Sequence, residues 1–250
     1  MSAVQLNITP LKPSEVPPED AILAAANEVL ESTKSWKQGK SYFNNTVKTF
    51  SRPKGPHDGA GWYCRVSEHT ADDATFDEFW SKLGNDKPEN EMKFIGDIKK
   101  VTLIKRISDT QAIWSMYYNF PPPISPRVFT VVQIVHLNTA SPRTGLVISL
   151  PIDLGGDPEL LQLQEKGVMG RYVSVERILE LDDGKVEWRM ATSSTPGGRI
   201  PQFVAEKSMA GKISEDVPHF LHWFHTVREA TMTKAAAPAN PATAPEAAEI

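Results

Sequence analysis

Hydrophobic and polar residues alternate along much of the middle of the chain. In residues 61–69, Trp62, Cys64 and Val66 share one side, while Arg65 and Ser67 lie on the other. A period of two predicts a strand with one buried face. Other segments of strand-forming composition are 40–51, 98–107, 111–120, 127–137, 145–153, 170–181 and 185–194. The sequence Asp182-Asp183-Gly184 predicts a tight turn that joins the last two strands into a hairpin.

Helical spacing is confined to three parts of the chain. Residues 19–32 carry apolar side chains on one face, and Thr75 caps a short helix over 76–83. From Ser214 to about Thr231 the apolar residues Val217, Phe220, Leu221, Phe224 and Val227 recur at helical intervals. Pro218 fits the first turn of this helix but would break a helix running through it from Pro201. Strands joined by hairpins, with helices at the start, middle and end, predict an α+β fold with an antiparallel sheet.

Composition narrows the function classes. The chain has 250 residues, 40% of them hydrophobic and 23% charged, with a net charge of −4. This slightly acidic balance argues against a nucleic-acid partner, and no apolar run has the length of a membrane span. The single cysteine, Cys64, excludes an intrachain disulfide and a cysteine-cluster metal site. With no secretory signal in the first ten residues, we expect a cytoplasmic protein, and a monomer.

Three regions are predicted from the distribution of prolines and alanines. Residues 1–18 contain Pro10, Pro13, Pro17 and Pro18 and are expected to be extended. Residues 19–233 contain no linker and are expected to form one domain. Residues 234–250 are rich in alanine and proline, which predicts a disordered tail because so little apolar surface can be buried.

Several motifs resemble those of START domains, the lipid-transfer domains related to the steroidogenic acute regulatory protein. They are Gly170-Arg171-Tyr172, the 182–184 turn, the stretch 195–204 and the proline-containing segment 121–130. Residues 62–69, 76–80, 125–129 and 208–209 are more similar to a START-like family of fungal proteins with no assigned function. Val128 and Thr195 stand where START proteins usually have aspartate, so contacts made by those acids are not carried over.

The resemblance implies a helix-grip fold of the START and Bet v 1 type, in which a bent antiparallel sheet wraps around the C-terminal helix and encloses a cavity. It implies binding of one lipid or other hydrophobic small molecule, with transfer between membranes, and hence transient membrane contact, as a further expectation. The side chains expected to line the cavity are Arg65, Trp114, Met116, Tyr118, Trp188, Met190, Phe203, Phe220 and Phe224. For each apolar one, ordinary core packing is the alternative.

Candidate chemistry beyond this is sparse. Arg65, Ser67 and His69 would meet a ligand only if their strand face points inward, which the pattern leaves open. Arg171 and Arg177 are weaker candidates for polar cavity groups. His219, His222 and His225 lie away from the apolar arc of the last helix, so we predict no metal site and no cofactor. No catalytic motif is present, which favours a binding protein over an enzyme. The alternatives are a polyketide cyclase or aromatase that uses the same cavity, and a scaffold with a vestigial pocket.

Overall fold

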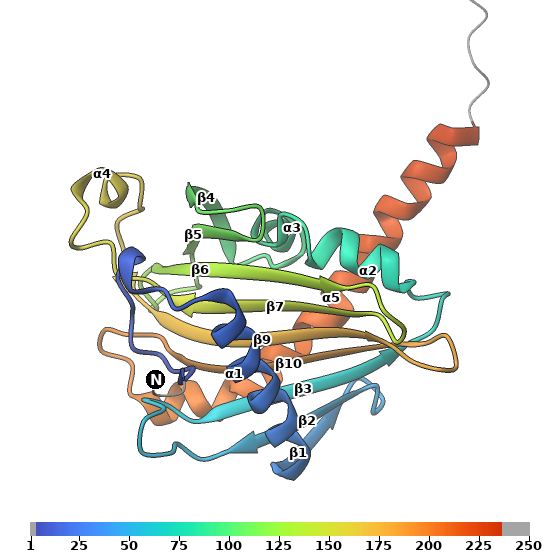
Figure 1. Cartoon of the computed structure of the whole chain (residues 1–250), viewed down its shortest axis with the longest axis horizontal. Coiled ribbons are helices and arrows are strands. Elements are labelled where there is room, and N and C mark those ends of the chain that lie inside the picture. The colour runs from blue at the N-terminus through green and yellow to red at the C-terminus, as the bar shows by residue number, and fades with distance from the viewer. Residues whose placement is uncertain (1–3, 237–250) are drawn as a thin grey trace, which may run out of the picture.

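The computed structural model describes residues 4–236, with side chains as far as residue 231. Its sheet is antiparallel except for one short strand, and helices lie on both faces (Figure 1). The helices are α1 (Glu19–Ser32), α2 (Phe76–Leu83), α3 (Lys87–Phe94), α4 (Pro158–Leu161) and α5 (Gln202–Ala236). The strands are β1 (Lys37–Tyr42), β2 (Val47–Arg52), β3 (Trp62–His69), β4 (Ile98–Arg106), β5 (Gln111–Tyr118), β6 (Arg127–Asn138), β7 (Thr144–Pro151), β8 (Val168–Met169), β9 (Arg171–Glu180) and β10 (Val186–Thr195).

The strand order brings distant parts of the chain together at the centre of the sheet. The order is β1-β2-β3-β10-β9-β7-β6-β5-β4, with β8 pairing in parallel with β6. The predicted 182–184 turn joins β9 to β10, and β10 then pairs with β3, more than a hundred residues earlier in the chain. The α+β class and the antiparallel sheet are therefore confirmed.

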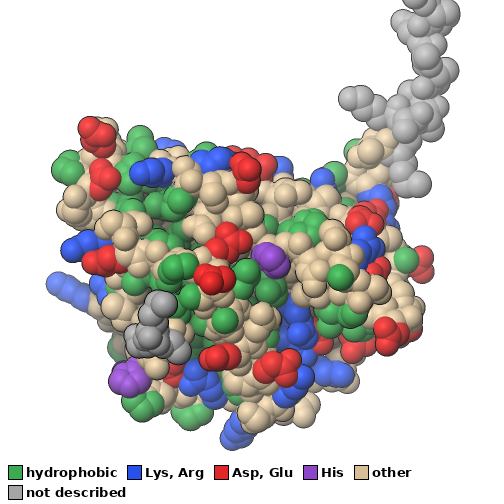
Figure 2. Space-filling model, viewed as in Figure 1, with side chains coloured by type: hydrophobic (Ala, Val, Ile, Leu, Met, Phe, Trp, Pro, Cys, Tyr) green, Lys and Arg blue, Asp and Glu red, His purple; other side chains and the backbone are tan. Residues whose placement is uncertain are grey.

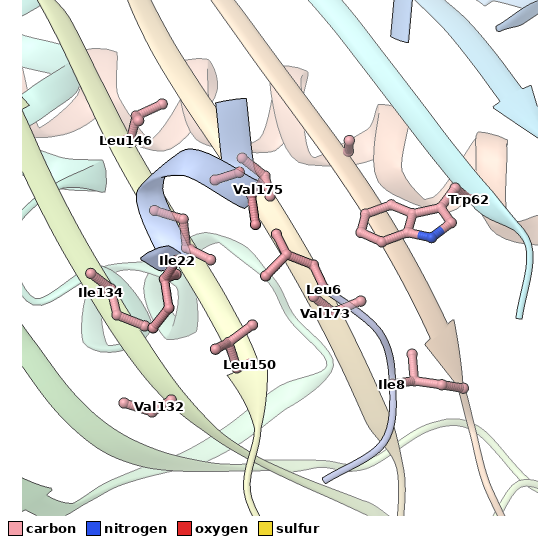
Figure 3. Close-up of a cluster of buried hydrophobic side chains, with 14 of the residues drawn as sticks. Leu6, Ile8, Ile22, Trp62, Val132, Ile134, Leu146, Leu150, Val173 and Val175 are labelled. Carbon is pink, nitrogen blue, oxygen red and sulfur yellow. The ribbon is translucent and has the colours of Figure 1, made fainter. Parts of the chain in front are cut away.

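One face of the sheet, called here the outer face, carries the larger hydrophobic core. Helix α1 and the segment that precedes it cover this face (Figure 1). Figure 3 shows Ile22 of α1 and Leu6 of the N-terminal segment against strand residues such as Val175. Because Leu6 and Ile8 are buried, the segment before α1 contributes to folding through apolar burial. It also pairs with the sheet through one isolated bridge, Leu11 to Ile152.

The opposite face, called here the inner face, packs against α5, α2 and α3. Its apolar cluster is smaller and largely aromatic, and includes Phe79 of α2, Trp188 of β10 and Phe220 of α5. Helix α2 is built as the sequence predicts: Thr75 caps it in a reciprocal hydrogen-bond pair with Glu78, and Phe76, Phe79 and Leu83 are buried. The Trp80 ring packs directly on Gly145 of β7, a position that leaves no room for a side chain.

Two predicted elements need correction. Residues 40–51 form two strands and a turn, because Phe43, Asn44 and Asn45 adopt the left-handed conformation that asparagine tolerates well. Helix α5 begins at Gln202 and passes through Pro218 without ending there, so the prediction of a break was wrong. Ile213, Val217 and Phe220 are buried on both sides of the proline, and this burial outweighs the one backbone hydrogen bond that Pro218 cannot make.

Figure 2 shows acidic and basic side chains interspersed over the face that carries α1. Among the described residues, no helix combines the length and the apolar character needed to cross a membrane. Of the predicted tail, residues 234–236 belong to α5, and the remainder lies outside the described residues.

Candidate functional site

The register of β3 decides which of its faces points inward. Arg65 pairs with Met190 and Ser67 pairs with Trp188, and Trp188 belongs to the inner cluster. Cys64 and Val66 belong to the outer core. Arg65, Ser67 and His69 therefore lie on the inner face, beneath α5. His69 is buried there, its Nε2 lies 2.8 Å from the hydroxyl of Ser67, and burial lowers its pKa.

Most of the predicted cavity residues share this inner face. On β5, Trp114, Met116 and Tyr118 alternate with residues such as Ile113 that belong to the outer core. The sulfur of Met116 lies 4.0 Å from the hydroxyl of Tyr172, a residue of β9. Met190 is half-buried and stands between Arg65 and Glu176 in the sheet.

The aromatic residues of α5 differ in environment. Phe220 is fully buried, with ring centroids 5.1 Å from Phe79 and 5.2 Å from Trp188. Phe224 is also buried and stacks on Phe220 at 5.7 Å. Phe203, at the start of the helix, leaves 72% of its surface exposed and so lies on the outside of the molecule. Phe220 and Phe224 close one end of the inner face by ordinary aromatic packing.

Five charged side chains meet under α5. We call them the buried charge cluster: Arg65 of β3, Lys87 and Glu91 of α3, Glu176 of β9 and Asp216 of α5. Burying charge in this way is costly unless each charge is paired and hydrogen-bonded. Glu176 meets that condition, since it accepts from Arg65 at 3.2 Å, from Lys87 at 3.0 Å and from the Trp188 indole at 2.6 Å.

Electrostatics within the cluster distinguish its carboxylates. The pKa of Glu176 is lowered, because the cations Lys87 and Arg65 outweigh its burial. Burial raises the pKa of Glu91, although Glu91 also pairs with Lys87. The pKa of Asp216 is raised to about 7, mainly by burial, which its ion pair with Arg65 only partly offsets. Asp216 therefore titrates near neutrality.

Arg65 is the least satisfied member of the cluster. Its side chain is 1% exposed, and its guanidinium lies 4.0 Å from the centre of the Trp188 ring. Nη2 donates to Glu176, and Nε lies 3.9 Å from Asp216 Oδ2, too far for a hydrogen bond. Among the described residues, none accepts a hydrogen bond from Nε or Nη1. Buried donors without a partner are rare in native proteins and call for an explanation.

Three polar groups on the inner face and on α5 keep accessible surface, although burial dominates the pKa of each. Asp216 keeps 25% of its side-chain surface accessible although burial dominates its pKa. Tyr118 and Tyr172 are half-buried, and burial raises the pKa of each well above its usual range. These residues are thus polar groups of the inner face and of α5 whose side chains keep accessible surface.

A separate, open pocket of about 380 Å³ lies on the same face of the sheet. Trp114, Gln133 and Val135 form its strand side, and Trp80 and Asp86 lie at its α2 and α3 side. Trp114 is thereby the one predicted cavity residue that lines this opening.

The sequence analysis selected only Arg65 of the five residues in the buried charge cluster. It also considered Arg177, a residue outside the cluster, for the cavity. Lys87, Glu91, Glu176 and Asp216 were not selected, although Asp216 interrupts the apolar stripe of Ile213, Val217 and Phe220. An acid on an apolar helix face was the available signal. Arg177, considered for the cavity, instead alternates with the inward-facing Glu176 and pairs with Glu187 at 2.7 Å.

A mostly antiparallel sheet that packs one face against a long C-terminal helix is the helix-grip fold. Three human structures share this fold. The STARD10 structure has a TM-score of 0.70 and 12% identity, and the match covers 88% of this chain and 84% of that one. StAR-related lipid transfer protein 5 has a TM-score of 0.69 and 16% identity, with 84% of this chain and 95% of that one covered. The StarD13 (DLC2) lipid transfer and protein localization domain has a TM-score of 0.60 and 14% identity, with 84% of this chain and 98% of that one covered. Residues 62–224 match the model of the family described as "Protein of unknown function (DUF3074)", and the chain belongs to that family. No curated protein matches the chain.

Proposed function

We propose that this protein binds one lipid or similar hydrophobic molecule in the space between the inner face of the sheet and α5. The observation that carries the proposal is the residual accessibility of Asp216 on α5 and of Tyr118 and Tyr172 on the inner face of the sheet. A pocket for a small hydrophobic molecule combines apolar walls with a few polar groups that orient the ligand. The half-buried Met190 supplies apolar wall, and the buried charge cluster supplies the polar end.

Transfer between membranes is the second part of the proposal. Two of the similar structures are titled as lipid transfer proteins or domains, and this chain shares their fold. A carrier must touch a membrane to load and release its ligand, and Phe203 and Val204 at the start of α5 are exposed apolar side chains suited to such contact. We propose a cytoplasmic monomer, in keeping with a single, free and buried cysteine.

Native mass spectrometry of protein purified from its own host tests the proposal. We expect a bound species in a ratio of about one to one, and extraction with organic solvent should release a hydrophobic molecule. Spectra of the bare polypeptide, together with no uptake from a lipid extract of the host, would refute ligand binding.

An enzyme remains the second candidate because of one observation. Asp216, whose pKa is about 7, lies beside Arg65, and an acid that titrates near neutrality can both take and give a proton. Cyclisation or dehydration of a polyketide would use such a group. Incubation with a host metabolite extract, followed by mass analysis, should show a product with the native protein and none with the Asp216→Asn variant if this second candidate is correct.

A further inference from the structure

The unpartnered donors of Arg65 carry information about the ligand. Nε and Nη1 have no acceptor among the described residues, and the whole side chain is 1% exposed. Leaving such donors unsatisfied destabilises the folded protein, so an acceptor that arrives with a ligand would restore what the chain lacks. Asp216 Oδ2 is the nearest carboxylate to Nε, at 3.9 Å. Nε of Arg65 and Oδ2 of Asp216 are too far apart to hydrogen-bond to each other. A ligand oxygen near both atoms could hydrogen-bond to each of them.

The charges around Arg65 decide what kind of acceptor fits. The buried charge cluster holds two cations, Arg65 and Lys87, against three carboxylates, Glu91, Glu176 and Asp216. The cluster is therefore neutral when Asp216 is protonated and carries one excess negative charge when all three acids are ionised. A carboxylate or phosphate head group would add further buried negative charge and face three acids. An ammonium head group would direct N–H donors and a positive charge at the unpartnered donors of Arg65.

We propose that the ligand is an amphipathic molecule whose head group is an uncharged oxygen, a hydroxyl or carbonyl, held between Arg65 and Asp216. This inference rests on the proposed function and narrows the class of ligand. The oxygen accepts from Nε or Nη1 of Arg65, and a hydroxyl also donates to Asp216. The apolar part of the molecule then lies against Met190 and the rings of Tyr118 and Tyr172, which share the inner face with Arg65.

Competition among probes of one chain length isolates the head group. The wild-type protein is offered 1-dodecanol, dodecanoate, dodecyl phosphate and dodecylammonium, and bound species are quantified by native mass spectrometry and by tryptophan fluorescence, since Trp188 stacks on Arg65. We expect dodecanol to bind at least about tenfold more tightly than either anion, because each anion adds a buried negative charge to a cluster that already holds three acids. Equal or stronger binding of an anion or of the ammonium would overturn the inference.

Two variants connect the preference to the named residues. At about pH 8, where Asp216 is largely ionised, Asp216→Asn removes one negative charge, so the affinity ratio of dodecanol to dodecanoate should fall by about tenfold. Arg65→Met removes the donors while keeping a long apolar side chain, and it should weaken dodecanol binding by about tenfold. Arg177→Met is the matched control, because Arg177 also has an unpartnered buried Nε but belongs to the other face of the sheet. An unchanged ratio in Asp216→Asn contradicts the inference even if Arg65→Met fails to fold.

The outcomes separate this inference from the function on which it rests. Binding of all four probes with no head-group preference leaves ligand binding in place and removes the role of Arg65 and Asp216. Failure of every probe, together with a bare polypeptide from the host, removes both. Equal losses in Arg65→Met and Arg177→Met would mean that dodecanol affinity responds to general stability, which also contradicts the inference.

Discussion

Asp216 shows how strongly one side chain depends on its surroundings. It lies on the buried stripe of α5, faces Arg65 of β3, and has Lys87 and Glu91 of α3 and Glu176 of β9 as charged neighbours. Desolvation favours its neutral form, and Arg65 and Lys87 together do not cancel that effect. The ordinary pKa of 3.8 therefore becomes about 7 in the folded protein.

This shift predicts a pH dependence of stability. Between about pH 4 and about pH 7, the folded state binds more protons at Asp216 than the unfolded state does, so stability falls as pH rises and levels off above pH 7. Asp216→Asn lacks this loss. We expect the variant to exceed wild type by up to about 4 kcal/mol in unfolding free energy at about pH 8, with the difference shrinking toward about pH 5. Urea unfolding across that range measures it, with the exposed Asp182→Asn as control; a constant difference at all pH values would contradict the prediction.

Phe220 and Phe203 test burial within one helix. The side chain of Phe220 is 0% exposed and packs against other aromatic rings, whereas Phe203 is 72% exposed. Phe220→Ala should destabilise the protein by about 3–5 kcal/mol, since it removes packed aromatic surface, whereas Phe203→Ala should change stability by less than about 0.5 kcal/mol. Chemical unfolding of the ligand-free protein measures both. A loss below about 1 kcal/mol for Phe220→Ala would mean that its ring borders open space rather than packed core.

Among the helices, α5 best illustrates how packing overrides a local preference. Pro218 removes one backbone donor and crowds the preceding turn, yet the helix continues from Gln202 to Ala236. Ser214 donates its hydroxyl to the carbonyl of Ala210, one of several side-chain bonds along the helix. The buried residues Ile213, Val217, Phe220 and Phe224 bind both halves of α5 to the same face of the sheet.

Replacement of this proline should therefore stabilise the protein. Pro218→Ala restores a helical N–H and removes the steric conflict, and we expect a gain of about 1–3 kcal/mol after the larger entropy of the unfolded chain is counted. Thermal and urea unfolding measure the gain. Pro201→Ala serves as control, because Pro201 immediately precedes α5 and costs the helix no hydrogen bond. Destabilisation by Pro218→Ala would show that the backbone conformation imposed by proline is needed for packing.

The two faces of the sheet differ in the kind of residues that they bury. The outer face is covered by α1 and the N-terminal segment and is densely apolar. The inner face combines an aromatic cluster with the buried charge cluster under α5. The larger apolar core on the outer face thus contributes most of the stability. The inner face contains buried polar and charged groups that are rare in an ordinary hydrophobic core.

Membrane contact is the prediction that involves the protein as a complete carrier. Phe203→Ser should reduce association with phospholipid vesicles by about threefold or more, since one exposed aromatic ring contributes to partitioning into the interface. The folded stability should not change, because Phe203 is largely exposed. Sedimentation with vesicles measures the effect. Phe43→Ser, which alters another exposed phenylalanine in the β1–β2 turn, is the matched control, and equal losses in both variants would place membrane contact elsewhere.

The linear pattern by itself determined the class of fold. Alternation in residues 61–69 and strand-forming composition elsewhere identified most strands of the sheet, Thr75 marked the start of α2, and Asp182-Asp183-Gly184 marked the β9–β10 hairpin. These signals depend on neighbours along the chain, and local chemistry was sufficient to read them. The motifs in 121–130 and 195–204 then indicated the START-like arrangement that the comparison with human STARD10 confirms.

Only the tertiary structure decided the inward face of β3, the continuity of α5 and the buried charge cluster. Arg65, Glu91, Glu176 and Asp216 are far apart in sequence, and their ionisation and pairing arise from distances that pairing of β3 with β10 and docking of α3 and α5 create. Strand alternation specifies two faces but not which one meets the helix, since either assignment has the same period. The polar end of the candidate site is therefore a product of long-range packing, in which desolvation and charge pairing act between residues that the sequence keeps apart.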